Sequence, residues 1–180
     1  MNKKLYLILI VFLFNYQNSF SQDYLAESKK LGLVSYLTTV KSISEYKLDG
    51  FVQNLGYVSH EEALVHQRSS QVLLLIEIDS DDTKCIIPGK LFEYMVSERP
   101  ILAIGPKNSD FENIIKQTNT GVFYQNNEKN ELKSQILSYF NQYLENNLKV
   151  NAVGLQQYSR KKLTEQLEMH HSLNLMIHIS

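Results

Sequence analysis

Apolar and polar positions alternate along the chain in blocks that predict strands separated by helices. Continuous apolar runs at 71–77 (QVLLLIE) and 100–104 (PILAI) are typical of strands covered on both faces. The segments 51–58 and 121–124 are rich in aromatic and branched residues and predict two further strands. In 24–48, apolar residues recur about every three positions, which indicates one or two short helices. Longer helices are expected at 59–69, 88–98, 109–118, 128–147 and 155–170.

Three of these helices have sequence signals at their first residues. Ser59 with Glu62, and Ser109 with Glu112, have the spacing of a capping box, in which serine and glutamate satisfy each other's backbone N–H groups. Pro88 suits the first turn of a helix, where its missing N–H costs no hydrogen bond.

The alternation of buried strands with helices predicts an α/β fold, a Rossmann-like parallel sheet flanked by helices. Right-handed crossovers bring the carboxyl ends of such strands to one edge of the sheet, where ligands bind. We expect the loops at that edge to be 58–60, 77–90, 105–110 and 125–127.

The first residues have the layout of a targeting segment. A basic start is followed by an apolar run at 5–14 and by the small residues Ser19 and Ser21. The run is shorter than the roughly 20 apolar residues that a spanning helix needs. Residues 1–22 are therefore predicted to be a signal-like or membrane-anchor segment, with membrane contact through 5–14; a buried first strand or helix is the alternative.

Composition narrows the remaining possibilities. With 180 residues, the chain fits one domain, expected at 23–170 and followed by a tail at 171–180. The 18 Lys and Arg balance the 19 Asp and Glu, so no nucleic acid partner is expected. The single cysteine, Cys85, excludes an internal disulfide and a zinc site with several thiolates, and no metal site is expected.

The densest candidate chemistry lies at 86–105 (IIPGKLFEYMVSERPILAIG). Pro88 and Gly89 open a helix whose free N–H groups can hold an anion that Gly89 allows to come close. Lys90 adds a charge for phosphate, and Glu93, one turn on, can accept hydrogen bonds from a sugar diol. These parts match a nucleotide diphosphate with its ribose. The alternative is an ordinary helix start with a surface ion pair, since the P-loop spacing is absent.

Five segments in colinear order resemble a known family. They are GYVSHEEAL, SSQVLLLIE, IIPGKLFEYMVSERPILAIG, SDFENIIKQTNTG and YSRKKLTEQL, spread over 45–170. Together they look like the C-terminal domain of a GT-B fold glycosyltransferase, of the retaining group-1 (family 4) kind that assembles bacterial surface polysaccharides.

The resemblance implies a domain that binds a nucleotide-sugar donor substrate and needs no separate cofactor. Glu93 would correspond to the second glutamate of the family's E-x7-E motif, which binds the nucleotide ribose. Pro88, Gly89 and Lys90 would face the diphosphate and sugar. The loop that contacts the nucleobase would be formed by Tyr57, Val58 and Ser59.

Departures from the family put turnover in doubt. The first glutamate of the motif falls on Cys85, although Lys84 or Lys90 could substitute, and the catalytic residues stay unidentified. No acceptor-binding domain is recognised, so the chain is expected to be a fragment that is weak or inactive as an enzyme alone. Partners would then be a separate N-terminal glycosyltransferase domain, or a second copy through 155–170.

Two other interpretations stay open. The first is a non-enzymatic exported or membrane-tethered interaction module, and the second is a leader joined to a decayed enzyme. The signal-like start favours export or tethering, whereas the family resemblance favours the cytoplasmic face of the membrane.

Overall fold

The computed structural model describes residues 41–53, 55–56, 58–78, 80–165 and 168. The chain divides into two compact units, Met1–Ser70 and Gln71–Ser180. The predicted signal-like segment 1–22 and tail 171–180 lie outside the described residues, and so does most of the helical region predicted at 24–48. Their structure stays a prediction.

The first unit contains a helical stretch at 41–45 and the helix α2, His60–Ser69. Its predicted capping box is confirmed: the Ser59 hydroxyl accepts from the Glu62 backbone N–H, and the Glu62 carboxylate accepts from that of Ser59 at 2.9 Å. Side-chain and backbone groups three residues apart thus define where the helix begins.

The strand predicted at 51–58 is wrong for the residues that the structure describes there, none of which is in a strand. The backbone N–H groups of Phe51 and Val52 donate to the Leu48 carbonyl at 2.8 and 3.1 Å, which makes a local turn. Gly56 has a φ of 65°, in the left-handed region that an extended strand does not contain. Local hydrogen bonds therefore replace the expected sheet ladder.

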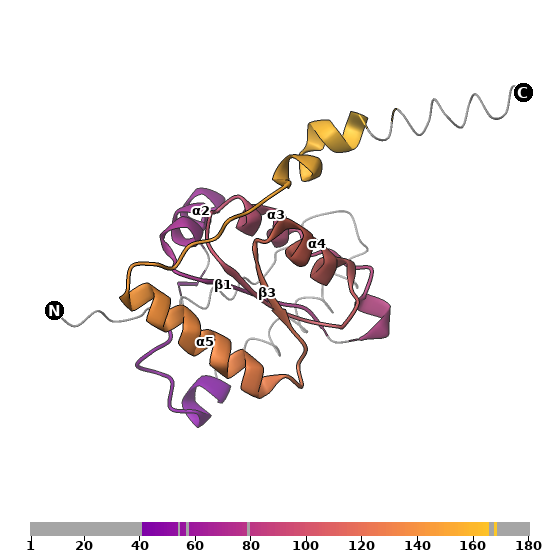
Figure 1. Cartoon of the computed structure of the whole chain (residues 1–180). Coiled ribbons are helices and arrows are strands. Elements are labelled where there is room, and N and C mark those ends of the chain that lie inside the picture. Colours follow the sequence, from indigo (N-terminus) through magenta and orange to yellow (C-terminus); the bar gives the residue numbers. More distant parts are fainter. Residues whose placement is uncertain (1–40, 54, 57, 79, 166–167, 169–180) are drawn as a thin grey trace, which may run out of the picture. The chain divides into compact units, whose positions relative to one another are not determined.

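The second unit is built on a parallel sheet (Figure 1). In the described part of the chain it has three strands, β1 Leu73–Ile76, β2 Ile101–Ile104 and β3 Gly121–Tyr124, in the order β1-β2-β3. In the register, Leu73 pairs with Ile101, which pairs with Gly121. Helices connect and follow these strands, so the unit has the predicted α/β, Rossmann-like fold class.

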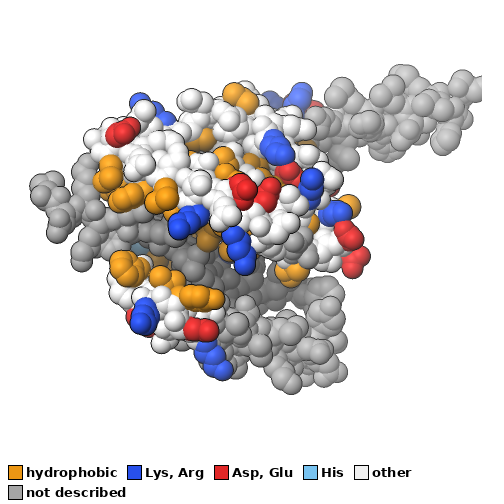
Figure 2. Space-filling view, turned by 60° about the horizontal axis from the view of Figure 1, so that its bottom comes forward, with side chains coloured by type: hydrophobic (Ala, Val, Ile, Leu, Met, Phe, Trp, Pro, Cys, Tyr) orange, Lys and Arg blue, Asp and Glu red, His pale blue; other side chains and the backbone are white. Residues whose placement is uncertain are grey.

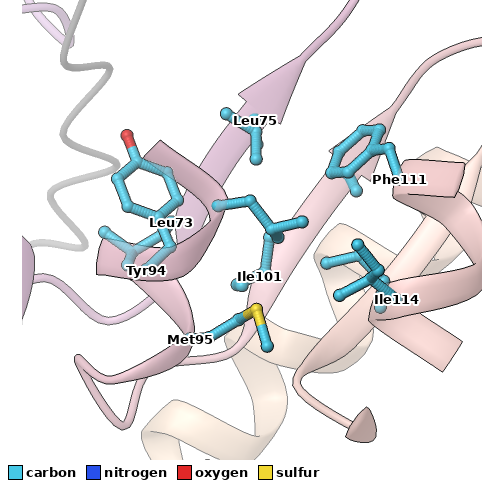
Figure 3. Packing of buried hydrophobic residues seen from close by; sticks show 10 residues of the cluster. Leu73, Leu75, Tyr94, Met95, Ile101, Phe111 and Ile114 are labelled. Carbon is cyan, nitrogen blue, oxygen red and sulfur yellow. The ribbon is translucent and has the colours of Figure 1, made fainter. Parts of the chain in front are cut away.

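One face of this sheet carries the hydrophobic core, which Figure 3 shows at close range. Two helices cover it, α3 Lys90–Met95 and α4 Asp110–Thr118. Phe111 lies edge-on against Phe123, with ring centres 5.7 Å apart. Full burial of each large apolar side chain contributes about 1.5–3 kcal/mol. The buried cluster consists of Leu73, Leu75, Leu91, Tyr94, Met95, Ile101, Ala103, Phe111, Ile114 and Ile115.

The opposite face is covered less completely within the second unit. The helix α5, Lys129–Leu144, lies on this side at β3, where the Tyr124 hydroxyl lies 3.3 Å from the Gln135 Oε1 atom (Figure 1). None of the residues of α5 is fully buried. Ile76, at the end of β1, keeps 56% of its surface exposed. The apolar run at 71–77 predicted a strand buried on both faces, whereas the end of β1 is exposed on this face.

The helix predicted at 155–170 is broken near its start. Leu155–Tyr158 forms a short 3-10 helix, and Ser159 is extended, with φ −69° and ψ 145°. An α-helix then begins at residue 160, with the Ser159 hydroxyl accepting from the Lys162 N–H at 3.2 Å. Leu155 and Tyr158 are partly buried and pack against the core. Self-association through 155–170 stays a prediction.

Candidate functional site

The loop between β1 and α3 is held by internal hydrogen bonds at the carboxyl edge of the sheet. The Thr83 hydroxyl donates to the Ile78 carbonyl at 2.6 Å, and the Ile86 N–H donates to the Thr83 carbonyl at 2.9 Å. The Asp110 N–H donates to the Lys84 carbonyl at 2.9 Å. The loop is therefore fastened to the start of α4 rather than only to its own ends.

The start of α3 is open. Gly89 has helical angles, φ −56° and ψ −31°, and no side chain of the described residues caps it. A Cβ atom built on Gly89 would meet none of the described chain within 4 Å. Glycine is thus required here neither by a positive φ nor by a close neighbour. The helix is still fixed in place, because Leu91 is completely buried and its N–H donates to the Pro88 carbonyl at 2.9 Å.

Three charged side chains interact at this start. Partial burial lowers the pKa of Lys90, and the carboxylates of Glu93 and Glu77 oppose that shift. Partial burial also raises the pKa of Glu77, against the effects of the Ile78 N–H and the Lys90 ammonium group. A half-buried lysine therefore lies within electrostatic reach of two carboxylates. Such a group can attract a phosphate while its neighbours accept hydrogen bonds from hydroxyls.

The structure brings four of the predicted site residues together at one place: Pro88, Gly89, Lys90 and Glu93 form the start and first turn of α3. Val58 and Ser59 belong to the first unit, and Tyr57 lies outside the described residues. The Ser59 hydroxyl also donates to the Glu62 carboxylate at 2.9 Å, so its hydrogen bonds serve the cap of α2. The part of Val58 and Ser59 in a nucleobase loop therefore stays a prediction.

Sequence reasoning missed Glu77. A signal was present, because a carboxylate follows directly after a buried apolar strand, at the end where ligands of parallel sheets bind. The run 71–77 as a whole predicts a strand, and that prediction does not distinguish the charged last residue from the apolar ones before it. Cys85, the residue in the loop before Pro88, is exposed and forms no disulfide.

The start of α4 is occupied by the protein's own groups. The Ser109 hydroxyl accepts from the Glu112 N–H at 3.1 Å, as a capping box requires. The Glu112 carboxylate, however, accepts from the Asn108 N–H at 2.6 Å and pairs with Lys116. In the predicted capping box the Glu112 carboxylate would accept from the Ser109 N–H. It accepts from the N–H of the preceding residue instead.

Wider features of the described residues add little further chemistry. Among them, no group of three or more His, Cys, Asp or Glu side chains could hold a metal ion. None of the described helices has the length and apolar character needed to cross a membrane. Figure 2 shows Lys and Arg side chains interspersed with Asp and Glu on the visible face, without a field of one sign.

Comparison with protein-family models, with curated proteins and with solved structures gives no match to this chain. The resemblance to glycosyltransferases therefore rests on the sequence segments alone. The geometry adds a site of its own, an open glycine beside a half-buried lysine with two glutamates, at the carboxyl edge of a parallel sheet.

Proposed function

We propose that the second unit binds the nucleotide diphosphate part of a nucleotide-sugar donor, as the donor-binding domain of a glycosyltransferase does. The observation that carries this is the start of α3, where open space at Gly89 adjoins Lys90, with Glu93 one turn along. The position is the one at which parallel α/β sheets bind nucleotides. The colinear resemblance over 45–170 supports the same ligand class.

The chemistry of the site divides between phosphate and sugar. Without a Cβ atom at Gly89, a phosphate oxygen can approach the backbone closely. Lys90 would supply the positive charge, and a bound phosphate would favour its charged form against the burial that now lowers its pKa. The Glu93 carboxylate can accept two hydrogen bonds, which suits the vicinal hydroxyls of a ribose.

We propose donor binding rather than turnover by the chain alone. Sugar transfer also needs an acceptor held in line with the donor and a site that excludes water. Cys85 stands where the family has its first glutamate, and a thiol cannot replace the carboxylate as a hydrogen-bond acceptor of similar strength. Binding to a donor would survive this change better than catalysis.

Isothermal titration calorimetry on the full chain tests this proposal. Four compounds are titrated separately, because the proposal does not specify the base: UDP, UDP-glucose, GDP and GDP-mannose. Lys90→Met keeps the aliphatic stem and removes the charge, so we expect at least about tenfold weaker binding, the usual effect of losing one charge-assisted contact. The matched control is Lys133→Met on the exposed surface of α5, which should leave the affinity unchanged.

Two results would contradict the proposal. One is the absence of binding by any of the four compounds. The other is an equal loss of affinity in Lys90→Met and Lys133→Met, since a general loss of positive charge, rather than a site at α3, would then explain the binding.

A further inference from the structure

The last described segment of the chain carries positive charges that the proposed nucleotide site does not use. Arg160, Lys161 and Lys162 are consecutive, and all three residues are exposed. They form the first turn of the helix that begins at residue 160, in the yellow part of Figure 1. Positive charge is disfavoured at the first turn of a helix, because the positive end of the helix dipole lies there. The stability of the helix therefore gives no reason for these charges.

The hydrogen bonds and the ion pair of this helix are internal. The Ser159 hydroxyl accepts from the Lys162 N–H at 3.2 Å, and the Thr164 hydroxyl donates to the Arg160 carbonyl at 2.9 Å. Lys162 pairs with Glu165 at 3.1 Å, but both side chains are nearly half exposed, and such a pair contributes little. No carboxylate of the described residues pairs with Arg160 or Lys161. These charges are therefore available to an anion outside the fold.

The segment before the helix is fastened to the core of the second unit. Leu155 and Tyr158 are partly buried against it, and the ring centre of Tyr158 lies 5.9 Å from that of Phe92. The Val153 N–H donates to the Thr118 carbonyl at 2.8 Å. The positive charges begin two residues after the packed tyrosine, so the helix is tied to the domain at its first end.

Apolar residues follow the positive charges. Leu163 keeps 43% of its surface exposed. In the sequence, Leu167 comes about one helical turn later, and 173–179 (LNLMIHI) has apolar side chains at five of its seven positions. Of these, Leu163 alone lies within the described residues. A basic segment followed by apolar residues is typical of segments that lie on anionic membranes, where cations meet the headgroups and apolar side chains enter the boundary with the acyl chains.

We propose that the chain docks through 160–179 on a membrane surface that contains anionic phospholipid. Arg160, Lys161 and Lys162 bind the headgroup phosphates, and Leu163 with the apolar residues after it enters the boundary between headgroups and acyl chains. A nucleic acid or an acidic protein would match the charges but would leave the apolar residues without a role. This docking is independent of the proposed nucleotide site and of the predicted membrane contact through 5–14, and it requires no spanning helix.

Vesicle co-sedimentation of the full chain tests this docking. Vesicles of phosphatidylcholine are compared with vesicles of phosphatidylcholine and phosphatidylglycerol in equal parts. We expect the wild type to bind the anionic vesicles more tightly. The triple variant Arg160→Gln, Lys161→Gln, Lys162→Gln should bind them about tenfold to a hundredfold more weakly, the combined effect of three basic residues near an anionic surface.

The matched control removes the same amount of charge elsewhere. Lys129, Lys133 and Lys149 are exposed, and their triple substitution by Gln should leave binding to anionic vesicles nearly unchanged. Raising the salt concentration to about 0.5 M should weaken binding of the wild type as the first triple variant does, without any change in the chain. Leu163→Ser should weaken binding to anionic vesicles about fivefold and leave binding to heparin unchanged, because the lost contact is apolar.

Three results would overturn the proposal. Equal binding of the wild type to neutral and anionic vesicles would assign membrane contact to a segment other than 160–162. An equal loss in both triple variants would make net charge responsible. Binding to heparin or duplex DNA that needs 160–162, without binding to vesicles, would assign these charges to a different anion. Circular dichroism of each variant should match the wild type, since all the substituted residues are exposed.

Discussion

The starts of α3 and α4 occupy equivalent places, each after a strand of the parallel sheet and each on the core face. At α4, Ser109 caps the helix, and the Asp110 N–H donates to the Lys84 carbonyl. At α3, the corresponding position is Gly89, which no side chain of the described residues caps and beside which space is open. The start of α4 makes hydrogen bonds within the fold, and the start of α3 is where we propose that the ligand binds.

Under the proposed function, this difference separates residues that stabilise the fold from residues that bind the ligand. In α4, the N–H groups of Asp110 and Glu112 donate to groups of the protein itself, the Lys84 carbonyl and the Ser109 hydroxyl. The helix α3 is held in place by Leu91, Tyr94 and Met95, which are buried in the core. Its start can therefore stay uncapped. A substitution at the start of α4 should therefore lower mainly the free energy of unfolding. A substitution at the start of α3 should lower mainly the affinity for the ligand.

The largest expected effect concerns the anchor of α3. Leu91→Ala should lower the free energy of unfolding by about 2–5 kcal/mol, because it removes a completely buried side chain and leaves a cavity. Urea unfolding followed by circular dichroism measures this. The matched control is Leu163→Ala, whose side chain is 43% exposed and should cost much less. Equal losses in both variants would mean that the core does not hold α3.

The next effect concerns the cap of α4. Ser109→Ala should cost about 1 kcal/mol, since the buried hydroxyl that accepts from the Glu112 N–H is lost. Its nucleotide affinity, measured well below the unfolding temperature, should equal that of the wild type. A variant of normal stability and impaired binding would reverse the contrast between the two helix starts.

Gly89→Ala should do the opposite. Because the backbone angles are helical and the space around the added Cβ is open, the free energy of unfolding should change by no more than about 0.5 kcal/mol. Nucleotide affinity should fall, since the methyl group occupies the place where a phosphate approaches the backbone. Thermal unfolding and calorimetry on the same sample test this prediction. If Gly89 had a purely structural role, Gly89→Ala would lower the stability of the protein and not its affinity for nucleotides alone.

The smallest effect is a dependence on pH. Burial raises the pKa of Glu77 in the folded protein above the ordinary value of 4.5. The folded state therefore favours the protonated carboxyl group. Relative to acid pH below 4.5, the free energy of unfolding falls as the pH rises through the pKa of the folded state. Glu77→Gln should therefore be slightly more stable than the wild type at pH 7, by no more than about 0.5 kcal/mol, and equal to it in acid. Urea unfolding at several pH values tests this. A variant that is less stable at pH 7 would show that Lys90 outweighs burial.

The fold class could be predicted because its signals are local and strong. The apolar runs at 71–77 and 100–104 contain the strands β1 and β2, and Ser59 and Ser109 mark helix starts through hydrogen bonds within one turn. The failure at 51–58 arose because composition does not show which hydrogen bonds a segment makes. The aromatic and branched residues favoured a strand, but turn hydrogen bonds to Leu48 formed instead.

The candidate site could be predicted only where neighbours in sequence are neighbours in space. Gly89, Lys90 and Glu93 share one helix turn, so their proximity followed from spacing. Glu77 is separated from Lys90 by a loop, and only the structure shows that the two charges interact. The break at Ser159, which lets Leu155 and Tyr158 reach the core, likewise depends on packing rather than on periodicity.

The most direct test of the central claim is an NMR titration of the 15N-labelled full chain with UDP-glucose and GDP-mannose. The account predicts that amide shifts concentrate at Gly89 and Lys90 and stay small at Asp110 and Glu112, whose N–H groups already have partners. Shifts centred on the start of α4, or no localised shifts with either compound, would contradict it.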